Sequence, residues 1–231
     1  LSSGITKEGH PDQDHNAKEI TWTVDVMNNS SEAVTTATLA DILPDGLGVP
    51  GNFVITELST GLNGDKVTGE IVDNVTPIPK DTGFELAFDH LAPYQGYRIQ
   101  YTTPITDRTQ TEFTNNAVFH DGETDLPAKA TVSGLTASNP IEKSGTYNSE
   151  TGQIDWTIVA NENGSAVENL IIDDLLPTGL SVDEEKFSVE KFVDGASVGK
   201  LSIEPNNFPI NLGSAAANEH FVINFSTDID Y

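Results

Sequence analysis

Apolar and polar residues alternate along much of this chain, and this pattern restricts the fold more than any other feature of the sequence. The clearest run is Ile20–Val26, in which every second residue is apolar. Because successive side chains of a strand point to opposite faces, the run predicts a strand with one buried face. Similar runs predict strands at Phe53–Leu58, Lys66–Val72, Phe84–Phe88, Tyr97–Thr102, Phe113–His120 and Ala130–Val132.

Turn sequences separate these runs, among them Asn63-Gly64 and Asp121-Gly122. Only Ser214–His220 suggests a helical turn. Many short strands joined by Gly, Asn, Asp and Pro turns are typical of β-sandwiches. We therefore expect an all-β fold.

The sequence also repeats itself. Three segments recur in the same order with offsets of 136, 134 and 133 residues: Ile5–Gly9 as Ile141–Gly145, Ile20–Val24 as Ile154–Ile158, and Leu39–Leu47 as Ile172–Leu180. A fourth, Tyr97–Thr103, is echoed by Phe221–Thr227. The repeats predict two tandem domains, residues 1–137 and 138–231, of which the second lacks the final strands of the first. The open edge this leaves would be filled by a neighbouring chain or by Lys129–Gly134.

Composition excludes several classes of function. The chain has 11 Lys and Arg against 36 Asp and Glu, a formal net charge of −25, which disfavours binding to nucleic acids and to anionic membranes. It has no cysteine, so disulfides, thiolate nucleophiles and Cys-ligated metals are excluded. No apolar run is long enough to span a bilayer. An acidic, cysteine-free chain of this kind favours a bacterial surface protein.

The ordered set of motifs resembles the collagen-binding-type domains of Gram-positive cell-wall adhesins. The set comprises Ile20–Val24, the segment Asp41–Leu47 with its Leu-Pro-x-Gly-Leu ending, Tyr101 with Thr103, and Phe113–Val118. The resemblance implies tandem immunoglobulin-like β-sandwich domains. It also implies a spontaneous isopeptide bond between a first-strand Lys and a last-strand Asn, promoted by a buried Asp. The matching positions are Lys7, Asn115 and Asp41 in the first copy, and Lys143 and Asp174 in the second, which has no matching Asn.

Strand geometry supports the same residues independently. Asp41 shares a strand face with Leu39 and Leu43, and Asn115 shares one with Phe113 and Ala117. Burial lowers the pKa of a Lys and raises that of an Asp. A neutral amine is a nucleophile, and a protonated carboxyl donates a hydrogen bond to the Asn carbonyl. The bond would form once, so this is not enzymatic turnover.

Each of these residues also has an ordinary structural interpretation. Asp41 and Asp174 precede turns, where Asp often caps a loop. Lys7 and Lys143 could be solvated lysines of edge strands, and Asn115 could be a ladder or turn residue. Trp22 and Trp156 lie on apolar faces, so we expect both in the core.

We expect no metal or cofactor. The cluster of His10, Asp12, Asp14, His15 and Asn16 lacks the Gly and the distal Glu of a calcium loop, so a solvated loop is expected. No nucleophile-elbow, zincin, P-loop or dinucleotide motif is present, which argues against an enzyme, and a glycosidase is the weakest alternative.

The predicted function is therefore a region of an adhesin on the bacterial cell wall surface, outside the cell. Its expected partner is an extracellular matrix or host surface protein, with collagen and fibrinogen as candidates. Anchoring to peptidoglycan would use a segment outside residues 1–231. The alternative is a structural stalk that holds a binding head elsewhere in the protein. The sequence does not distinguish these two functions.

Overall fold

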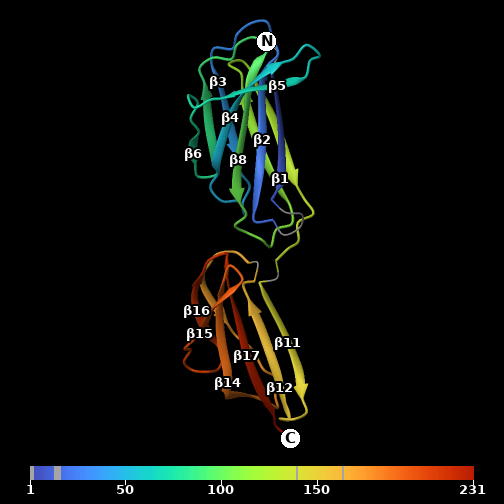
Figure 1. Ribbon diagram of the computed structural model, residues 1–231, viewed down its shortest axis with the longest axis vertical. Coiled ribbons are helices and arrows are strands. Elements are labelled where there is room, and N and C mark those ends of the chain that lie inside the picture. The colour runs from blue at the N-terminus through green and yellow to red at the C-terminus, as the bar shows by residue number, and fades with distance from the viewer. Residues whose placement is uncertain (1–2, 13–16, 139, 163) are drawn as a thin grey trace. The chain divides into compact units, whose positions relative to one another are not determined.

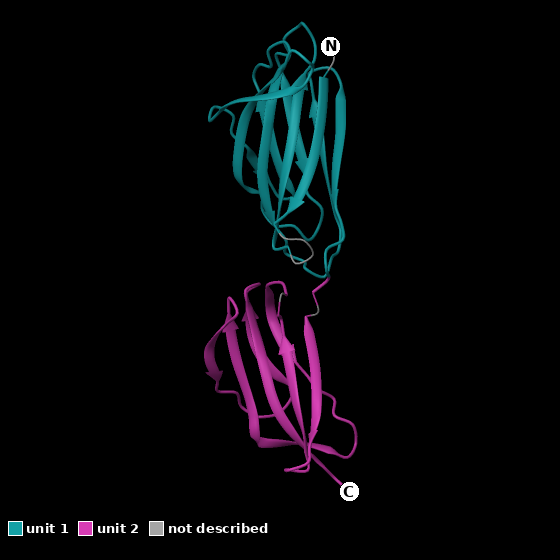
Figure 2. Ribbon diagram, turned by 45° about the vertical axis from the view of Figure 1, so that its right-hand side comes forward, with its two compact units in different colours: residues 1–136 teal, residues 137–231 magenta. Residues whose placement is uncertain are grey.

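A computed structural model describes residues 3–12, 17–138, 140–162 and 164–231. All regular structure in these residues is β-strand, in two compact units, Leu1–Thr136 and Ala137–Tyr231 (Figures 1 and 2). None of the described segments forms a helix that could cross a membrane. The predicted all-β class and the tandem sandwich architecture are confirmed.

The first unit is a sandwich of two five-stranded antiparallel sheets. In spatial order the first sheet contains β1 (Ser3–Pro11), β2 (Glu19–Asn28), β8 (Gln95–Pro104), β4 (Gly51–Thr60) and β5 (Lys66–Ile71). The second contains β10 (Asp125–Val132), β9 (Phe113–His120), β3 (Ala37–Ile42), β7 (Gly83–Phe88) and β6 (Ile78–Lys80). Strands distant in sequence thus become neighbours, and β9 lies directly beside β3.

The core of this unit follows from the alternation seen in the sequence. The apolar residues Ile20, Trp22 and Val24 of β2 are fully buried, as are Leu39 of β3 and Phe119 of β9. Burying a large apolar side chain contributes about 1.5–3 kcal/mol. The Trp22 Nε1–H donates to the Thr103 hydroxyl at 2.9 Å, which satisfies the one polar atom of the indole.

The second unit repeats part of this arrangement. One sheet contains, in spatial order, β11 (Ile141–Asn148), β12 (Gln153–Ala160), β17 (Glu219–Ile229), β14 (Leu180–Val193) and β15 (Ala196–Leu201). The other contains only β13 (Val167–Ile172) and β16 (Ile210–Ala215). The sequence repeats place β13 at the position of β3. Whereas β3 pairs with both β7 and β9, β13 pairs with β16 alone among the described strands.

One of the predictions about local structure is wrong. Ser214–His220 is not a helical turn: Ser214 and Ala215 end β16, a turn follows in which Glu219 N–H donates to Ala216 O at 3.0 Å, and β17 begins at Glu219. Pairing with β14 determines this conformation, and a run of small residues does not reveal it. Lys129–Val132 pairs with β9 of its own unit.

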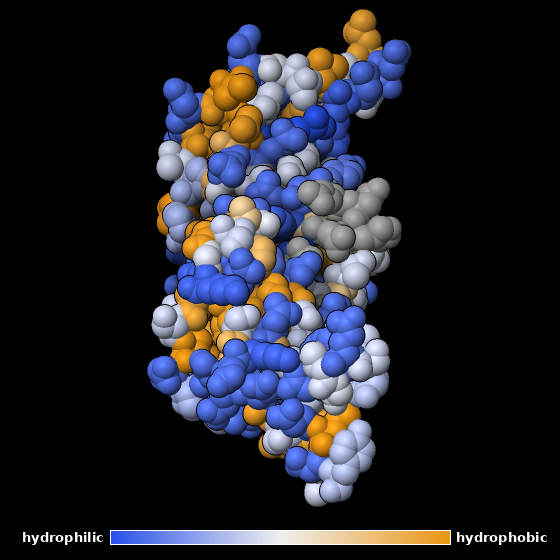
Figure 3. Space-filling view, turned by 60° about the horizontal axis from the view of Figure 1, so that its bottom comes forward, coloured by the Kyte–Doolittle hydropathy of each residue, from blue (hydrophilic) through white to orange (hydrophobic). Residues whose placement is uncertain are grey.

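Hydrophilic side chains dominate the face of the molecule shown in Figure 3, with smaller apolar groups interspersed among them. This surface agrees with the net charge of −25. Such an excess of one sign of charge favours solubility and opposes binding to polyanions.

Candidate functional site

Lys7 lies on an edge strand, yet its side chain is 0% exposed. It pairs with Val24 of β2 and points into the sandwich. The glycine two residues later makes room for this arrangement, because a Cβ at Gly9 would lie 2.3 Å from the Trp22 ring. Gly145 has the same relationship to Trp156, at 2.4 Å, which explains why Lys-x-Gly recurs in both copies. The solvated-lysine interpretation is wrong for Lys7.

The side chain of Asp41 forms a hydrogen bond with the side-chain nitrogen of Lys7. Asp41 lies in β3 on the same face as Leu39, and its side chain is also 0% exposed. Its Oδ2 contacts the Lys7 Nζ, which also donates to the backbone carbonyl of Asn116 at 3.3 Å. Asp41 is therefore not a turn cap but one half of a buried Lys–Asp pair.

Asn115 completes the predicted group of three residues. It is fully buried in β9, and its Nδ2 donates to the hydroxyl of Tyr101 at 3.0 Å. The same hydroxyl donates to Asp41 Oδ2. Lys7, Asp41 and Asn115 thus converge from three strands, β1, β3 and β9, on one buried polar cluster.

Tyr101 is the member of this cluster that the sequence did not single out. Its ring stacks on Phe53 at 5.5 Å between centroids and meets Phe84 edge-on at 4.8 Å, so it is held as a core aromatic. The sequence did contain one signal that could have identified Tyr101. The two copies differ at this position, because the residue of the second unit equivalent to Tyr101 is Phe225. The registers agree, since Tyr101 pairs with Trp22 and Phe225 pairs with Trp156.

Burial dominates the electrostatics of the cluster. Loss of hydration lowers the pKa of the Lys7 ammonium, against the attraction of Asp41. Loss of hydration likewise raises the pKa of Asp41, although the attraction of Lys7 and hydrogen bonds from Lys7 and Tyr101 oppose the shift. Both directions favour a neutral amine beside a protonated carboxyl. Such a pair combines a nucleophile with a proton donor.

Two acceptor atoms of the cluster are left without hydrogen bonds. Asp41 Oδ1 and Asn115 Oδ1 are buried and have no partner among the described residues. An unpaired buried acceptor costs about 1–3 kcal/mol. A proton on the Asp41 carboxyl would add a hydrogen-bond donor to this cluster. A reaction at the Asn115 amide would replace one of the polar groups that the cluster contains.

The second unit contains an equivalent Lys–Asp pair, but the surroundings of this pair differ from those in the first unit. Lys143 Nζ lies 2.6 Å from Asp174 Oδ2 and 4.4 Å from the centroid of the Trp156 ring. The Lys143 side chain is 34% exposed and that of Asp174 is 8% exposed. Trp156 is half-buried, although Trp22 is completely buried. No described residue of this unit corresponds to Asn115.

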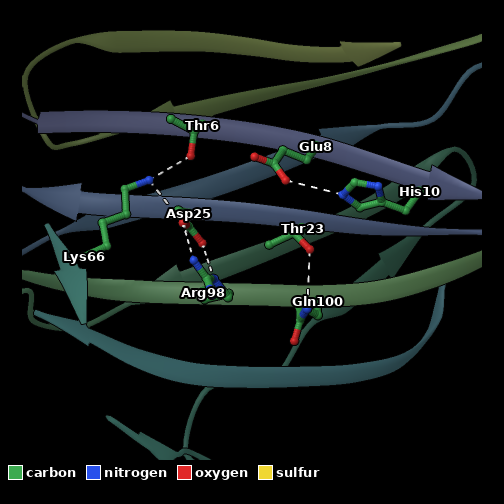
Figure 4. Close-up of polar contacts among 8 residues, drawn as sticks. All are labelled: Thr6, Glu8, His10, Thr23, Asp25, Lys66, Arg98 and Gln100. Atoms are coloured by element: carbon green, nitrogen blue, oxygen red, sulfur yellow. Dashed lines mark hydrogen bonds and ion pairs between the residues drawn. The ribbon is translucent and has the colours of Figure 1, made fainter. Parts of the chain in front are cut away.

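A second polar group lies on the outer face of the first sheet (Figure 4). Arg98 donates to Asp25 through Nε at 2.9 Å and Nη2 at 3.0 Å, and Lys66 Nζ donates to it at 3.1 Å. Burial alone would raise the pKa of Asp25, but the hydrogen bonds from Arg98 and Lys66 hold it below its ordinary value. A surface hollow of about 220 Å³ adjoins this group and is lined by Thr6, Asp25 and Lys66 among others.

His10 and Asp12 give no support for a metal, and His10 lies in strand β1 and not in the expected loop. Asp12 Oδ1 accepts from the backbone N–H of Lys18 at 2.8 Å, which is a loop-stabilising contact. The other members of that cluster, Asp14, His15 and Asn16, lie outside the described residues. Within the described part of the chain, no three acidic or histidine side chains are grouped to hold a cation.

Comparison with known families supplies the classification. The family model of the collagen binding domain matches residues 2–129 and 138–231, which is nearly the whole chain. The chain belongs to the collagen-binding domain family. The resemblance deduced from the sequence is confirmed, and both units carry the family signature.

Among solved structures, the collagen binding subdomain of the Enterococcus faecalis surface protein ACE is 15% identical, covers 57% of this chain and 95% of its own, and has a TM-score of 0.42. The collagen-binding domain of a Staphylococcus aureus adhesin is 17% identical, with coverages of 58% and 97% and a TM-score of 0.40. A Streptococcus pneumoniae pilus backbone protein is 12% identical, with coverages of 98% and 84% and a TM-score of 0.38. None of the curated proteins matches the sequence.

Proposed function

We propose that this member of the collagen-binding domain family is an adhesin region whose first unit is closed by an amide between Lys7 and Asn115. The observation that carries the proposal is the buried contact of Lys7 with Asp41, linked through Tyr101 to Asn115. A buried ion pair is costly to desolvate, and an ordinary core would gain more from apolar residues. A role of the Lys7–Asp41 pair in a chemical reaction would explain why the core contains this costly pair.

The proposed reaction uses the neutral pair. Transfer of a proton from the Lys7 ammonium to Asp41 leaves a nucleophilic amine in an apolar site. The Lys7 Nζ attacks the side-chain carbonyl carbon of Asn115, the bond from that carbon to Nδ2 breaks, and ammonia leaves. Of the two protons that Lys7 gives up, one passes to the departing ammonia and the other stays on the Asp41 carboxyl until the ammonia carries it away as ammonium.

The cross-link would act on stability and on mechanical strength. Closing a loop of roughly 100 residues by a covalent bond contributes about 4–5 kcal/mol in the chain-entropy estimate. The bond would also join the first strand, β1, directly to β9. A force applied along the chain would pass through this amide, so the strands between need not separate.

Proteolysis tests the bond directly. Digestion of the denatured protein should give one branched peptide in which the Lys7 segment is joined to the Asn115 segment, and the Asn115→Ala variant should give the two linear peptides. Linear peptides alone from the wild type would refute the cross-link.

The ligand is proposed to be an extracellular matrix protein, with collagen and fibrinogen as candidates, and the protein to be displayed on the cell wall. We place the contact on the outer face of the first sheet. There Glu8, His10, Lys66 and Arg98 are at least partly exposed and contribute nothing to the core (Figure 4). Immobilised collagen, fibrinogen and fibronectin should be compared, and the double variant His10→Ala, Glu8→Ala should bind less than wild type. Equal binding by this variant would refute the assignment of the face.

The second candidate function is a stalk. The same cross-link favours it, because resistance to force requires no ligand. A stalk would bind none of the three matrix proteins and would still contain the branched peptide.

A further inference from the structure

Tyr101 connects the residues of the proposed cross-link through one hydroxyl group. Its Oη donates to Asp41 Oδ2 and accepts from Asn115 Nδ2 at 3.0 Å. Phe53 and Phe84 hold its ring from two sides, so the hydroxyl has little freedom to move away. The hydroxyl therefore lies between the carboxyl group and the nitrogen that must depart.

Amide formation requires a proton at that nitrogen. After attack, the Lys7 nitrogen carries one proton too many, and Asn115 Nδ2 needs one more to leave as ammonia. The net transfer is one proton from Nζ to Nδ2. Asp41 Oδ2 contacts the Nζ of Lys7 directly, and Tyr101 Oη contacts the Nδ2 of Asn115.

We propose that Tyr101 is a catalytic residue of the cross-linking reaction, relaying the proton from Asp41 to the departing nitrogen of Asn115. The inference rests on the proposed function. In the tetrahedral intermediate Nδ2 is an amine with a free electron pair, so its hydrogen bond with Oη reverses. Oη gives its proton to Nδ2 and takes up the proton of the Asp41 carboxyl. The bond from Cγ to Nδ2 breaks, ammonia leaves, and Asp41 recovers a proton from Nζ.

The electrostatics agree with a relay that remains neutral. Burial, and then the neighbouring Asp41, raise the pKa of Tyr101 far above its ordinary value. A tyrosinate is therefore not formed, and the hydroxyl must gain one proton as it releases another. The relay needs no ionised tyrosine.

The second unit provides a natural comparison. Phe225 stands at the position of Tyr101, and its ring is buried next to Trp156 at 6.4 Å between centroids. The fold therefore accepts a phenyl ring here. The unit in which Lys7, Asp41 and Asn115 meet has the hydroxyl of Tyr101, whereas Phe225 has none.

The Tyr101→Phe variant of the full chain tests the relay. Wild type and variant are made by cell-free synthesis, quenched with acid at intervals, and weighed intact to follow the loss of one ammonia. Losing a proton donor of this kind slows a reaction by about 10²–10⁴-fold. We expect a decrease of that size, with folding unchanged by circular dichroism. Cross-linking of Tyr101→Phe at the wild-type rate would overturn the relay.

Thr103→Val is the matched control. It removes a buried hydroxyl from the same strand, one that binds Trp22 but not the reacting groups. The variant should lose some stability and cross-link at the wild-type rate. Slowing equal to that of Tyr101→Phe would assign both effects to looser packing and overturn the proposal.

Solvent isotope effects separate a relay from simple positioning. In mixtures of light and heavy water, the wild-type rate should depend on deuterium content with curvature, because two protons move together. The dependence for Tyr101→Phe should be linear. A linear dependence in wild type would reduce Tyr101 to a positioning residue. Absence of any ammonia loss in wild type would instead refute the cross-link itself.

Discussion

Lys7 and Lys143 occupy equivalent positions in the two copies, but the Lys7 side chain is 0% exposed and that of Lys143 is 34% exposed. The difference comes from strands β9 and β10, which cover the first unit and have no described counterpart in the second. The same Lys–Asp pair is consequently sealed in one unit and accessible in the other.

Amine-reactive labelling should report this difference. In native Asn115→Ala protein, which keeps both amines free, an acylating reagent should modify Lys143 while Lys7 remains unmodified. After denaturation both should react. Peptide mapping measures the two sites, and equal protection of Lys143 and Lys7 in the native protein would contradict the structure.

Gly9→Ala should destabilise the first unit. The added methyl group would lie 2.3 Å from the Trp22 ring, which must then shift within a packed core. Overpacking of this kind costs about 1–3 kcal/mol. Denaturant unfolding measures the loss, and Gly51→Ala is the control because a Cβ there meets no atom within 4 Å. Equal stability of the two variants would count against this account of the Lys-x-Gly motif.

Asp25→Asn should lower stability in a pH-dependent way. Arg98 and Lys66 hold the pKa of Asp25 below its ordinary value of 3.8 in the folded state, so the charged carboxylate stabilises the fold. This contribution is complete above the unfolded pKa and is lost as the pH falls through the folded pKa. At pH 7 the free energy of unfolding of the wild type should exceed that of the variant by about 1–2 kcal/mol, a modest difference because Arg98 and Lys66 are partly exposed. The difference should disappear as the pH falls below about 4.

The control for this prediction is Glu8→Gln, which removes an exposed carboxylate from the same sheet face. It should lower the free energy of unfolding at pH 7 by less than Asp25→Asn does, because an exposed ion pair contributes little. A gap for Asp25→Asn that stays constant down to pH 2 would contradict the assigned ion pairs.

The edge of β13 that pairs with no described strand should accept one. Residues 108–134, which contain β9 and β10, can be appended after Tyr231, at the place where the repeat would put them. Pairing with β13 and covering of Trp156 should raise the unfolding temperature of the second unit, because both bury apolar surface. Calorimetry measures the shift, and a scrambled segment of equal composition is the control. An unchanged temperature would refute strand addition at this edge.

Much of the fold and part of the site could be predicted from the sequence. Alternation along Ile20–Val26 revealed the strand, because burial of one face imposes a period of two. Lys7, Asp41 and Asn115 were identified because the repeat and the family motifs made them conspicuous, and the structure brings them together. Tyr101 was overlooked because a tyrosine on an apolar strand face looks like any other core aromatic. The position of its hydroxyl depends on how the two sheets pack together, which places it against Asp41 and Asn115.

Other features depend on contacts that a local pattern does not contain. The small residues after Gly213 suggest a helical turn, but pairing of β17 with β14 makes them the end of one strand and a turn. The Asp25 ion pairs join β2, β5 and β8, and the spacing of these residues in the sequence does not indicate that they meet.

The mass of the intact, denatured protein tests the central proposal most directly. If Lys7 and Asn115 are joined, the wild type weighs one ammonia less than its sequence requires. Lys7→Ala, Asp41→Ala and Asn115→Ala then have their full masses, while Lys143→Ala keeps the deficit of wild type. A wild-type protein of full mass would contradict the cross-link.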